Sequence, residues 1–213
     1  YNTDVVNFNK KSFIFEDKNS LSFEQILTDS IQKKFKLNKS ETPNFGHTNS
    51  TIWIKFTAKN NIADLTEKLY LFITPIWLDS IHVYIPTENN KYKHILSGQA
   101  HPFETRSLQK PHYFFDFPLK QEEEKTCYIA IQSQHIVSFH LHLGGLIGFN
   151  YKSQKDDSLF FLYIGMMFLL CSYNIFLAIG TKQKSNIFYG CYIFFLIMST
   201  VSYTHLRAHE TRH

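Results

Sequence analysis

The chain has 213 residues, of which 44% are hydrophobic and 19% charged, with only 8 Gly and 6 Pro, a composition that excludes collagen-like and intrinsically disordered chains. Its 22 Lys and Arg stand against 18 Asp and Glu, so the charge gives no reason to expect nucleic acid as a partner. Three cysteines without CxxC or Cys/His zinc spacing exclude a disulfide framework.

The first 150 residues are predicted to form a β domain. A short helix is expected near their start, because Ser22 and Gln25 have the spacing of a capping box. Many short strands without long helices between them favour a jelly-roll β-sandwich over residues 1–150. The predicted strands are Ser12–Phe15, Thr51–Lys59, Lys68–Thr74, Asp79–Ile85, Tyr92–Leu96, His112–Phe117, Thr126–Ser133 and Ser138–Leu143.

The strand Thr51–Lys59 carries the candidate ligand-binding residues. Trp53 and Lys55 share one face of this strand by alternation, and an aromatic ring beside a long polar side chain is typical of sugar contacts. Arg106, which precedes the strand His112–Phe117, is added by hypothesis as a third member of the ligand-binding site. The alternative is that Trp53 packs beneath a neighbouring segment, because tryptophan is highly buried on average. The core side of the strand is formed by Ile52, Ile54 and Phe56.

No chemistry-bearing motif accompanies these residues. His140 and His142 share one face of the strand Ser138–Leu143, but a third metal ligand is not evident, so no metal site is predicted. GxSxG, HExxH and Gly-rich phosphate loops are absent from the sequence, so neither an enzyme nor a cofactor is predicted.

A membrane hairpin is predicted over residues 158–200. Ser158–Gly180 holds no Asp, Glu, Lys, Arg or His over 23 residues, which makes about 34 Å of helix, enough for a hydrocarbon core of about 30 Å. A polar loop, Thr181–Asn186, separates it from a second apolar run, Ile187–Thr200. Because the loop carries Lys182 and Lys184 without an acid, we expect it in the cytoplasm and residues 1–157 outside.

The last segment has a different expected origin. Val201–Thr211 matches, residue for residue, the translation of the transposon end that is used in tagmentation sequencing libraries. We therefore expect residues 201–213 to be an adapter artefact and the native protein to continue past Thr200. The alternative is a metal site from His205, His209 and His213, which are spaced i, i+4, i+8.

Several segments, in their order along the chain, carry a family resemblance. In the β domain they are Phe45-Gly46, Thr51-Ile-Trp-Ile-Lys-Phe56, Asn60, Pro75-Ile-Trp-Leu-Asp79, Ile81-His-Val-Tyr84, Gly98, Arg106 and His112–Leu119. In the apolar part they are Ser172-Tyr-Asn-Ile-Phe-Leu177, Thr181–Asn186, Phe188-Tyr189 and Tyr192. The chain resembles the bacterial seven-transmembrane receptors with diverse intracellular signalling modules, and its β domain is similar to their second type of extracellular domain.

The resemblance implies the ligand-sensing N-terminal part of a multi-pass receptor in the cell membrane. The outer jelly roll, a fold related to carbohydrate-binding modules, would bind a carbohydrate or a related small molecule. A seven-helix bundle, here truncated to its first two helices, would pass the change to a missing cytoplasmic signalling module. A homodimer is one expected assembly of the chain. The alternatives are a membrane-anchored binding or adhesion protein and a membrane-bound glycan-active enzyme.

Overall fold

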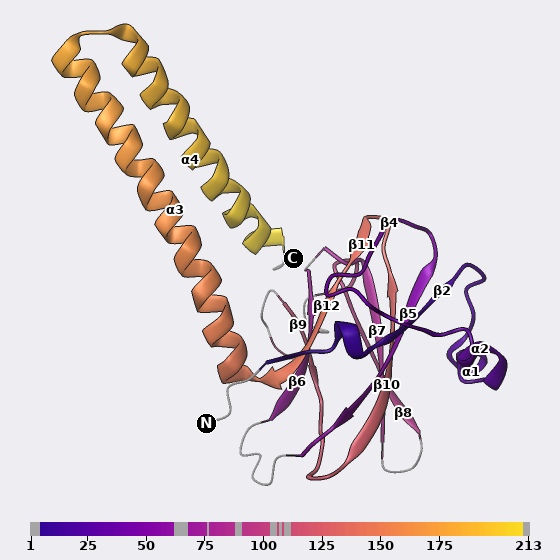
Figure 1. The fold of residues 1–213 in the computed structure, drawn as a ribbon. Coiled ribbons are helices and arrows are strands. Elements are labelled where there is room, and N and C mark those ends of the chain that lie inside the picture. The colour runs from indigo at the N-terminus through magenta and orange to yellow at the C-terminus, as the bar shows by residue number, and fades with distance from the viewer. Residues whose placement is uncertain are drawn as a thin grey trace. The chain divides into compact units, whose positions relative to one another are not determined.

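The computed structural model describes residues 5–61, 68–75, 77–87, 91–102, 106, 108 and 112–210, without the side chains of residues 151–157 and 203–210. The chain divides into two compact units, residues 1–149 and residues 150–213. The first unit consists mainly of strands, and the second consists of two long helices (Figure 1).

The strands are β1 (Val6–Asn7), β2 (Phe13–Asp17), β3 (Lys36–Leu37), β4 (Asn44–His47), β5 (Thr51–Lys59), β6 (Leu69–Thr74), β7 (Ser80–Pro86), β8 (Tyr92–Ser97), β9 (Tyr113–Asp116), β10 (Glu124–Gln132), β11 (Ile136–Ser138) and β12 (His140–Gly145). The helices are the 3-10 helix η1 (Asn9–Lys11) and the α-helices α1 (Phe23–Ile26), α2 (Asp29–Gln32), α3 (Leu146–Thr181) and α4 (Lys184–Glu210).

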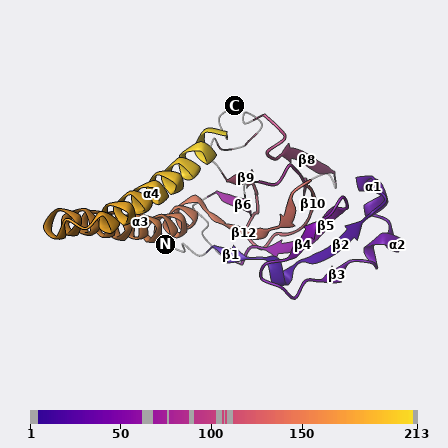
Figure 2. The same cartoon turned by 90° about the horizontal axis from the view of Figure 1, so that it is seen from above.

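The first unit is a sandwich of two main antiparallel sheets. The six-stranded sheet has the order β3-β2-β5-β10-β7-β8, the four-stranded sheet has the order β1-β12-β6-β9, and β11 pairs with β4. The view from above shows the two main sheets as separate layers, with α1 and α2 beyond the outer face of the six-stranded sheet (Figure 2). The main core lies between the layers and includes Ile54, Phe56, Phe115, Phe139 and Leu141.

The structure confirms the predicted mainly β fold followed by a pair of apolar helices. The strand predicted over Thr51–Lys59 is β5 with the same bounds. The strand predicted over Ser138–Leu143 is instead divided between β11 and β12, because the two pieces pair with different partners, β4 and β6. The jelly-roll assignment stays a prediction.

A second, smaller core covers the outer face of the six-stranded sheet. It joins Trp53, Tyr128 and Ala130 of the sheet to Ile26 of α1, and Phe23 packs against them. The predicted capping box starts α1: Ser22 Oγ accepts from the Gln25 backbone N–H, and Gln25 Oε1 accepts from the Ser22 backbone N–H. These two bonds fix the entry of α1 and thereby place Phe23 over the sheet.

A close backbone approach fixes the end of β8. Gly98 has a φ of +143°, and a Cβ built on it would lie 2.1 Å from the carbonyl oxygen of Asp79. The following residues hydrogen bond to the same segment, with Gln99 N donating to Leu78 O and Ala100 N donating to Asp79 O. A glycine is required here because any side chain would separate the two segments.

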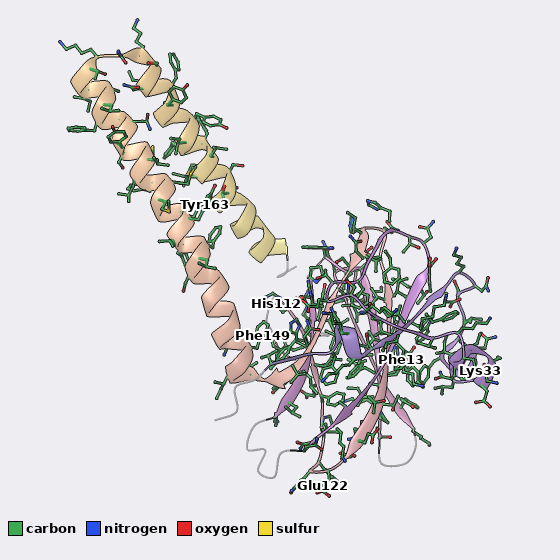
Figure 3. The ribbon with its side chains drawn as sticks, in the orientation of Figure 1. Phe13, Lys33, His112, Glu122, Phe149 and Tyr163 are labelled. Atoms are coloured by element: carbon green, nitrogen blue, oxygen red, sulfur yellow. The ribbon has the colours of Figure 1, made fainter. Side chains whose placement is uncertain are left out.

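Helix α3 follows the sandwich without a linker, because β12 ends at Gly145 and α3 begins at Leu146. Its first turn belongs to the first unit, where the Phe149 ring packs 4.8 Å from Phe72, 4.9 Å from Phe114 and 5.2 Å from His112 between ring centroids (Figure 3). The helix therefore starts well before the predicted span at Ser158, since the apolar pattern marks only the part suited to lipid.

Two helical stretches in the described chain, Ser158–Thr181 and Lys184–Ser202, are long and apolar enough to cross a membrane. Their large apolar side chains are exposed; Phe168, Phe176 and Phe188 are 64%, 72% and 73% accessible. This exposure distinguishes the helices from core helices of a soluble protein, whose apolar faces are buried.

Candidate ligand-binding site

Trp53 lies on the outer face of the six-stranded sheet and is 3% exposed. Its ring is stacked with the rings of Phe23 and Tyr84 at centroid distances of 6.2 and 5.8 Å. The alternative hypothesis, that Trp53 packs beneath a neighbouring segment, therefore agrees with the structure. Trp53 also lines a hollow in the surface of the domain.

Lys55 shares the outer face with Trp53, as predicted from the alternation, but its ammonium group is engaged. Lys55 Nζ donates to Gln32 Oε1 at 2.8 Å and lies 5.9 Å from the centroid of the Tyr128 ring. The Tyr128 hydroxyl donates to the same Gln32 oxygen at 3.2 Å. Lys55 therefore ties α2 to the sheet, and it does not line the hollow beside Trp53.

Arg106 is not brought to this face. Its guanidinium carbon lies 4.8 Å from the centroid of the Tyr113 ring, and Tyr113 belongs to the core between the two sheets. The Tyr113 hydroxyl donates to the carbonyl oxygen of Leu78, and burial, opposed by the Arg106 charge, raises the pKa of Tyr113 to about 12. Trp53 thus belongs to the second core, whereas Arg106 contacts a residue of the main core, and the structure does not form the predicted three-residue convergence.

The outer hollow is a concave site of about 540 Å³ over β5, β7, β8 and β10, beside the start of α1. Its volume falls within the range of small-molecule sites, about 300–1,000 Å³. It combines aromatic rings with polar side chains, which is the usual make-up of such sites. It is lined by Ser20, Leu21, Ser22, Phe23, Glu24, Thr51, Trp53, His82, Tyr84, Tyr92, His94, Ala130 and Gln132.

One donor of the lining residues has no partner within the described part of the chain. Trp53 Nε1 is buried, and no hydrogen-bond acceptor lies within reach of it among the described residues. A buried N–H group without a partner costs about 1–3 kcal/mol, and such groups are rare in folded proteins.

A pair of histidines forms the wall of the hollow over β7 and β8. His82 Nδ1 and His94 Nε2 are 3.0 Å apart, within hydrogen-bond distance, and the His94 ring stacks on Tyr84 with centroids 4.7 Å apart. Burial and the nearby His94 and His101 lower the pKa of His82, and burial lowers the pKa of His94. In the neutral pair one ring donates to the other, because a hydrogen bond between them needs one proton and one lone pair.

Further polar groups surround the opening. Hydrogen bonds, first from its own backbone N–H and then from Ser22, lower the pKa of Glu24, so it offers a carboxylate. Burial raises the pKa of Tyr84 and Tyr92, so both hydroxyls stay protonated. Gln132 Nε2 donates to Thr51 Oγ1 at 2.7 Å. The hollow can therefore both donate and accept hydrogen bonds, which suits a ligand that carries several hydroxyl groups.

Sequence reasoning missed most of this lining. The signal that was available is the alternation of β7, where Ile81, Val83 and Ile85 are buried and His82 and Tyr84 lie on the other face. Aromatic rings and histidines on the outward face of a strand point to a covered or binding face.

The metal alternatives have no further support in the structure. Within the described residues, no group of three or more His, Cys, Asp and Glu side chains is placed to hold a metal ion. The His140 and His142 rings are 6.1 Å apart between centroids. The side chains of His205, His209 and His213 lie outside the described part of the chain.

Two protein-family models match the sequence. The model described as 7TMR-DISM extracellular 2 matches residues 9–144, and the model described as 7TM diverse intracellular signalling matches residues 156–208. No curated protein matches the sequence. The first match covers more than half of the chain and includes every strand from β2 to β11, so the resemblance noted in the sequence is confirmed.

Proposed function

Because the chain belongs to the seven-transmembrane receptors with diverse intracellular signalling modules (7TMR-DISM), we propose that its outer hollow is the ligand-binding site of the receptor. The chain comprises the family's extracellular sensor domain and the start of its membrane domain. The proposed ligand is a carbohydrate or a related small polar molecule. Ligand binding would bias the helix bundle and, through it, a cytoplasmic signalling module.

The observation that carries this proposal is a hollow of about 540 Å³ that is lined by Trp53, whose buried Nε1–H has no partner among the described residues and would be satisfied by a ligand oxygen. Sugars present apolar faces and hydroxyl groups, which aromatic rings and paired donors and acceptors recognise together. The half-buried Tyr84 and Tyr92 offer ring surface, and His94, Gln132 and Glu24 offer polar atoms. Of the three residues predicted from sequence, only Trp53 is proposed to contact the ligand.

A glycan array probed with the full chain in neutral-lipid nanodiscs, followed by calorimetric titration of the hits, tests the site. His94→Ala and Gln132→Ala should each weaken binding roughly two- to tenfold, the range for one lost hydrogen bond. Lys93→Ala is the matched control, because Lys93 neighbours His94 on β8 but does not line the hollow. A ligand whose affinity is unchanged in both site variants would show that the hollow is not its binding site.

The proposed topology places residues 1–157 outside and the connection between α3 and α4 in the cytoplasm, because Lys182 lies in this connection and Lys184 begins α4, without an acid beside them. Labelling of Ser185→Cys in intact cells tests this, with the unsubstituted chain as the control for the three native cysteines. Labelling by a membrane-impermeant reagent from outside would contradict it.

A further inference from the structure

A groove separate from the outer hollow runs along the edge strand β3. It has a volume of about 770 Å³ and lies between β2, β3 and the segment that follows α2. Four lysines line it: Lys33, Lys34, Lys36 and Lys39. All four side chains are exposed, and Lys33 lies beside α2 in Figure 3.

The positive charge of the groove is local and unbalanced. Within the described chain, none of the four ammonium groups has an acidic partner, whereas Lys10 and Lys125 do. The one acid that lines the groove, Glu16, accepts a hydrogen bond from Ser50 Oγ at 2.9 Å. Residues 1–157 carry 18 Lys and Arg against 17 Asp and Glu, so the groove concentrates cations on a nearly neutral domain.

The acidic segment of the domain lies elsewhere. Glu122, Glu123 and Glu124 follow one another in the sequence, and Glu122 lies at a different end of the sandwich from Lys33 (Figure 3). A ligand with several negative charges is therefore attracted to the groove without meeting this acidic run. Clefts lined by one sign of charge raise the local concentration of opposite charges.

The other groups of the groove are already occupied. Asn38 Nδ2 donates to the carbonyl oxygens of Asn9 and Ser40, and Ser40 Oγ accepts from the Thr42 backbone N–H. The Phe15 and Phe45 rings pack against other phenylalanines, at 5.6 and 6.4 Å between centroids. Recognition here rests on the ammonium groups, and single-stranded nucleic acid, whose bases stack on free aromatic rings, is disfavoured.

We propose that this groove is a second binding site, which takes a linear acidic polysaccharide. The lysines occupy four of seven consecutive positions, from the C-cap residue of α2 to a residue just past β3. A row of carboxylates or sulfates along one chain matches this spread, whereas a single small anion would engage only part of it. The site is independent of the outer hollow, so it stands or fails separately from the proposed function.

The competing explanation is protection of the sheet edge. Lysines on an edge strand hinder pairing with the edge of another molecule, and β3 is the outermost strand of its sheet. Edge protection requires charge on β3 but no ligand. The two explanations differ in what the removal of the lysines changes, polysaccharide binding in one case and self-association in the other.

The test uses the full chain in nanodiscs of zwitterionic lipid, titrated with polygalacturonate, with neutral dextran as the polymer control. The groove variant replaces Lys33, Lys34, Lys36 and Lys39 with Gln. The matched control replaces Lys59, Lys68, Lys91 and Lys93, which are exposed and lie outside the groove. Each variant loses four positive charges, so a general loss of electrostatic attraction affects both variants equally.

Wild type should bind polygalacturonate but not dextran, and its affinity should fall by roughly one to two orders of magnitude between about 50 and 200 mM salt. The groove variant should lose roughly tenfold or more at the lower salt concentration, and the control variant should lose much less. Tryptophan fluorescence from Trp53 and Trp77 reports whether the groove variant is folded. If it is not, the two double variants, K33Q/K34Q and K36Q/K39Q, replace it and should each weaken binding.

Equal losses in the groove and control variants would overturn the proposal, because the binding would then follow net charge alone. Unchanged binding in the groove variant would also overturn it, and self-association of that variant would then assign the lysines to edge protection. Stronger competition by phosphatidylglycerol vesicles than by polygalacturonate at equal anionic charge would replace the polysaccharide with a membrane surface.

Discussion

Replacing Trp53 separates the packing role that the structure gives this side chain beneath α1 from its proposed role as a hydrogen-bond donor to a ligand in the outer hollow. Trp53→Ala removes a ring that is 3% exposed and stacked with Phe23 and Tyr84. Losing a buried tryptophan side chain costs about 3–5 kcal/mol. For a domain of this size the melting temperature should fall by roughly 10 °C.

Trp53→Phe keeps an aromatic ring in the second core but removes the Nε1–H. The smaller ring loses buried apolar area, while the change also removes an unpartnered buried donor that costs about 1–3 kcal/mol. Because these effects oppose each other, the free energy of unfolding should change by less than about 2 kcal/mol. Ligand affinity should fall roughly two- to tenfold, since the bond to Nε1 is lost.

Thermal melts and calorimetric titrations on the full chain in nanodiscs measure the two effects. Tryptophan fluorescence follows the sensor domain alone, because both tryptophans of the chain, Trp53 and Trp77, lie in it; in the Trp53 variants Trp77 remains as the reporter. Trp77→Phe is the matched control, since Trp77 does not line the hollow. The reasoning is refuted if Trp53→Phe binds the ligand as wild type does while Trp53→Ala changes only the melting temperature.

Three further predictions concern acid, a glycine and the end of the chain. The lowered pKa values of His82 and His94 mean that the fold favours their neutral forms. The stabilisation that the two neutral histidines contribute is therefore complete above about pH 6.5 and is lost as the pH falls through the lowered pKa values. His82→Gln should reduce the drop in melting temperature between about pH 7.5 and pH 5.5. An undiminished drop in this variant would mean that other groups cause the acid sensitivity. Gly98→Ala should cost about 2–4 kcal/mol in thermal melts, whereas Gly46→Ala, at a φ of +63° with open space around it, should cost only about 1 kcal/mol. Amplification of the locus from source DNA should show different codons after Thr200, and codons for the present segment there would contradict the adapter origin.

Local signals in the sequence predicted the local structure well. The alternation in Thr51–Lys59 predicted β5 and placed Trp53 and Lys55 on its outer face, which the structure shows. The spacing of Ser22 and Gln25 predicted the capping box that starts α1. Each of these predictions depends on neighbours a few residues apart, where alternation and capping are decisive.

The partners across the sheet were not predictable in the same way. β5 pairs with β10, and β10 with β7, so His82 reaches the neighbourhood of Trp53 through strands far apart in the sequence. The alternation of a strand gives its faces but not its neighbours. The tertiary neighbours of Arg106 were likewise not predictable, because its sequence position before a strand does not say which core its side chain contacts.

The two cores differ in what covers them, and the outer hollow lies beside the one that is covered by short helices. The main core lies between two hydrogen-bonded sheets, so a change there requires movement of whole strands. The second core is covered by α1 and α2, helices of four residues each, which are held by the capping box and by the bonds of Gln32 to Lys55 and Tyr128. Short elements with few contacts are the parts of a fold that adjust at least cost. A ligand in the outer hollow would therefore displace α1 and α2 first, while the strands of the sandwich beneath them keep their pairing register.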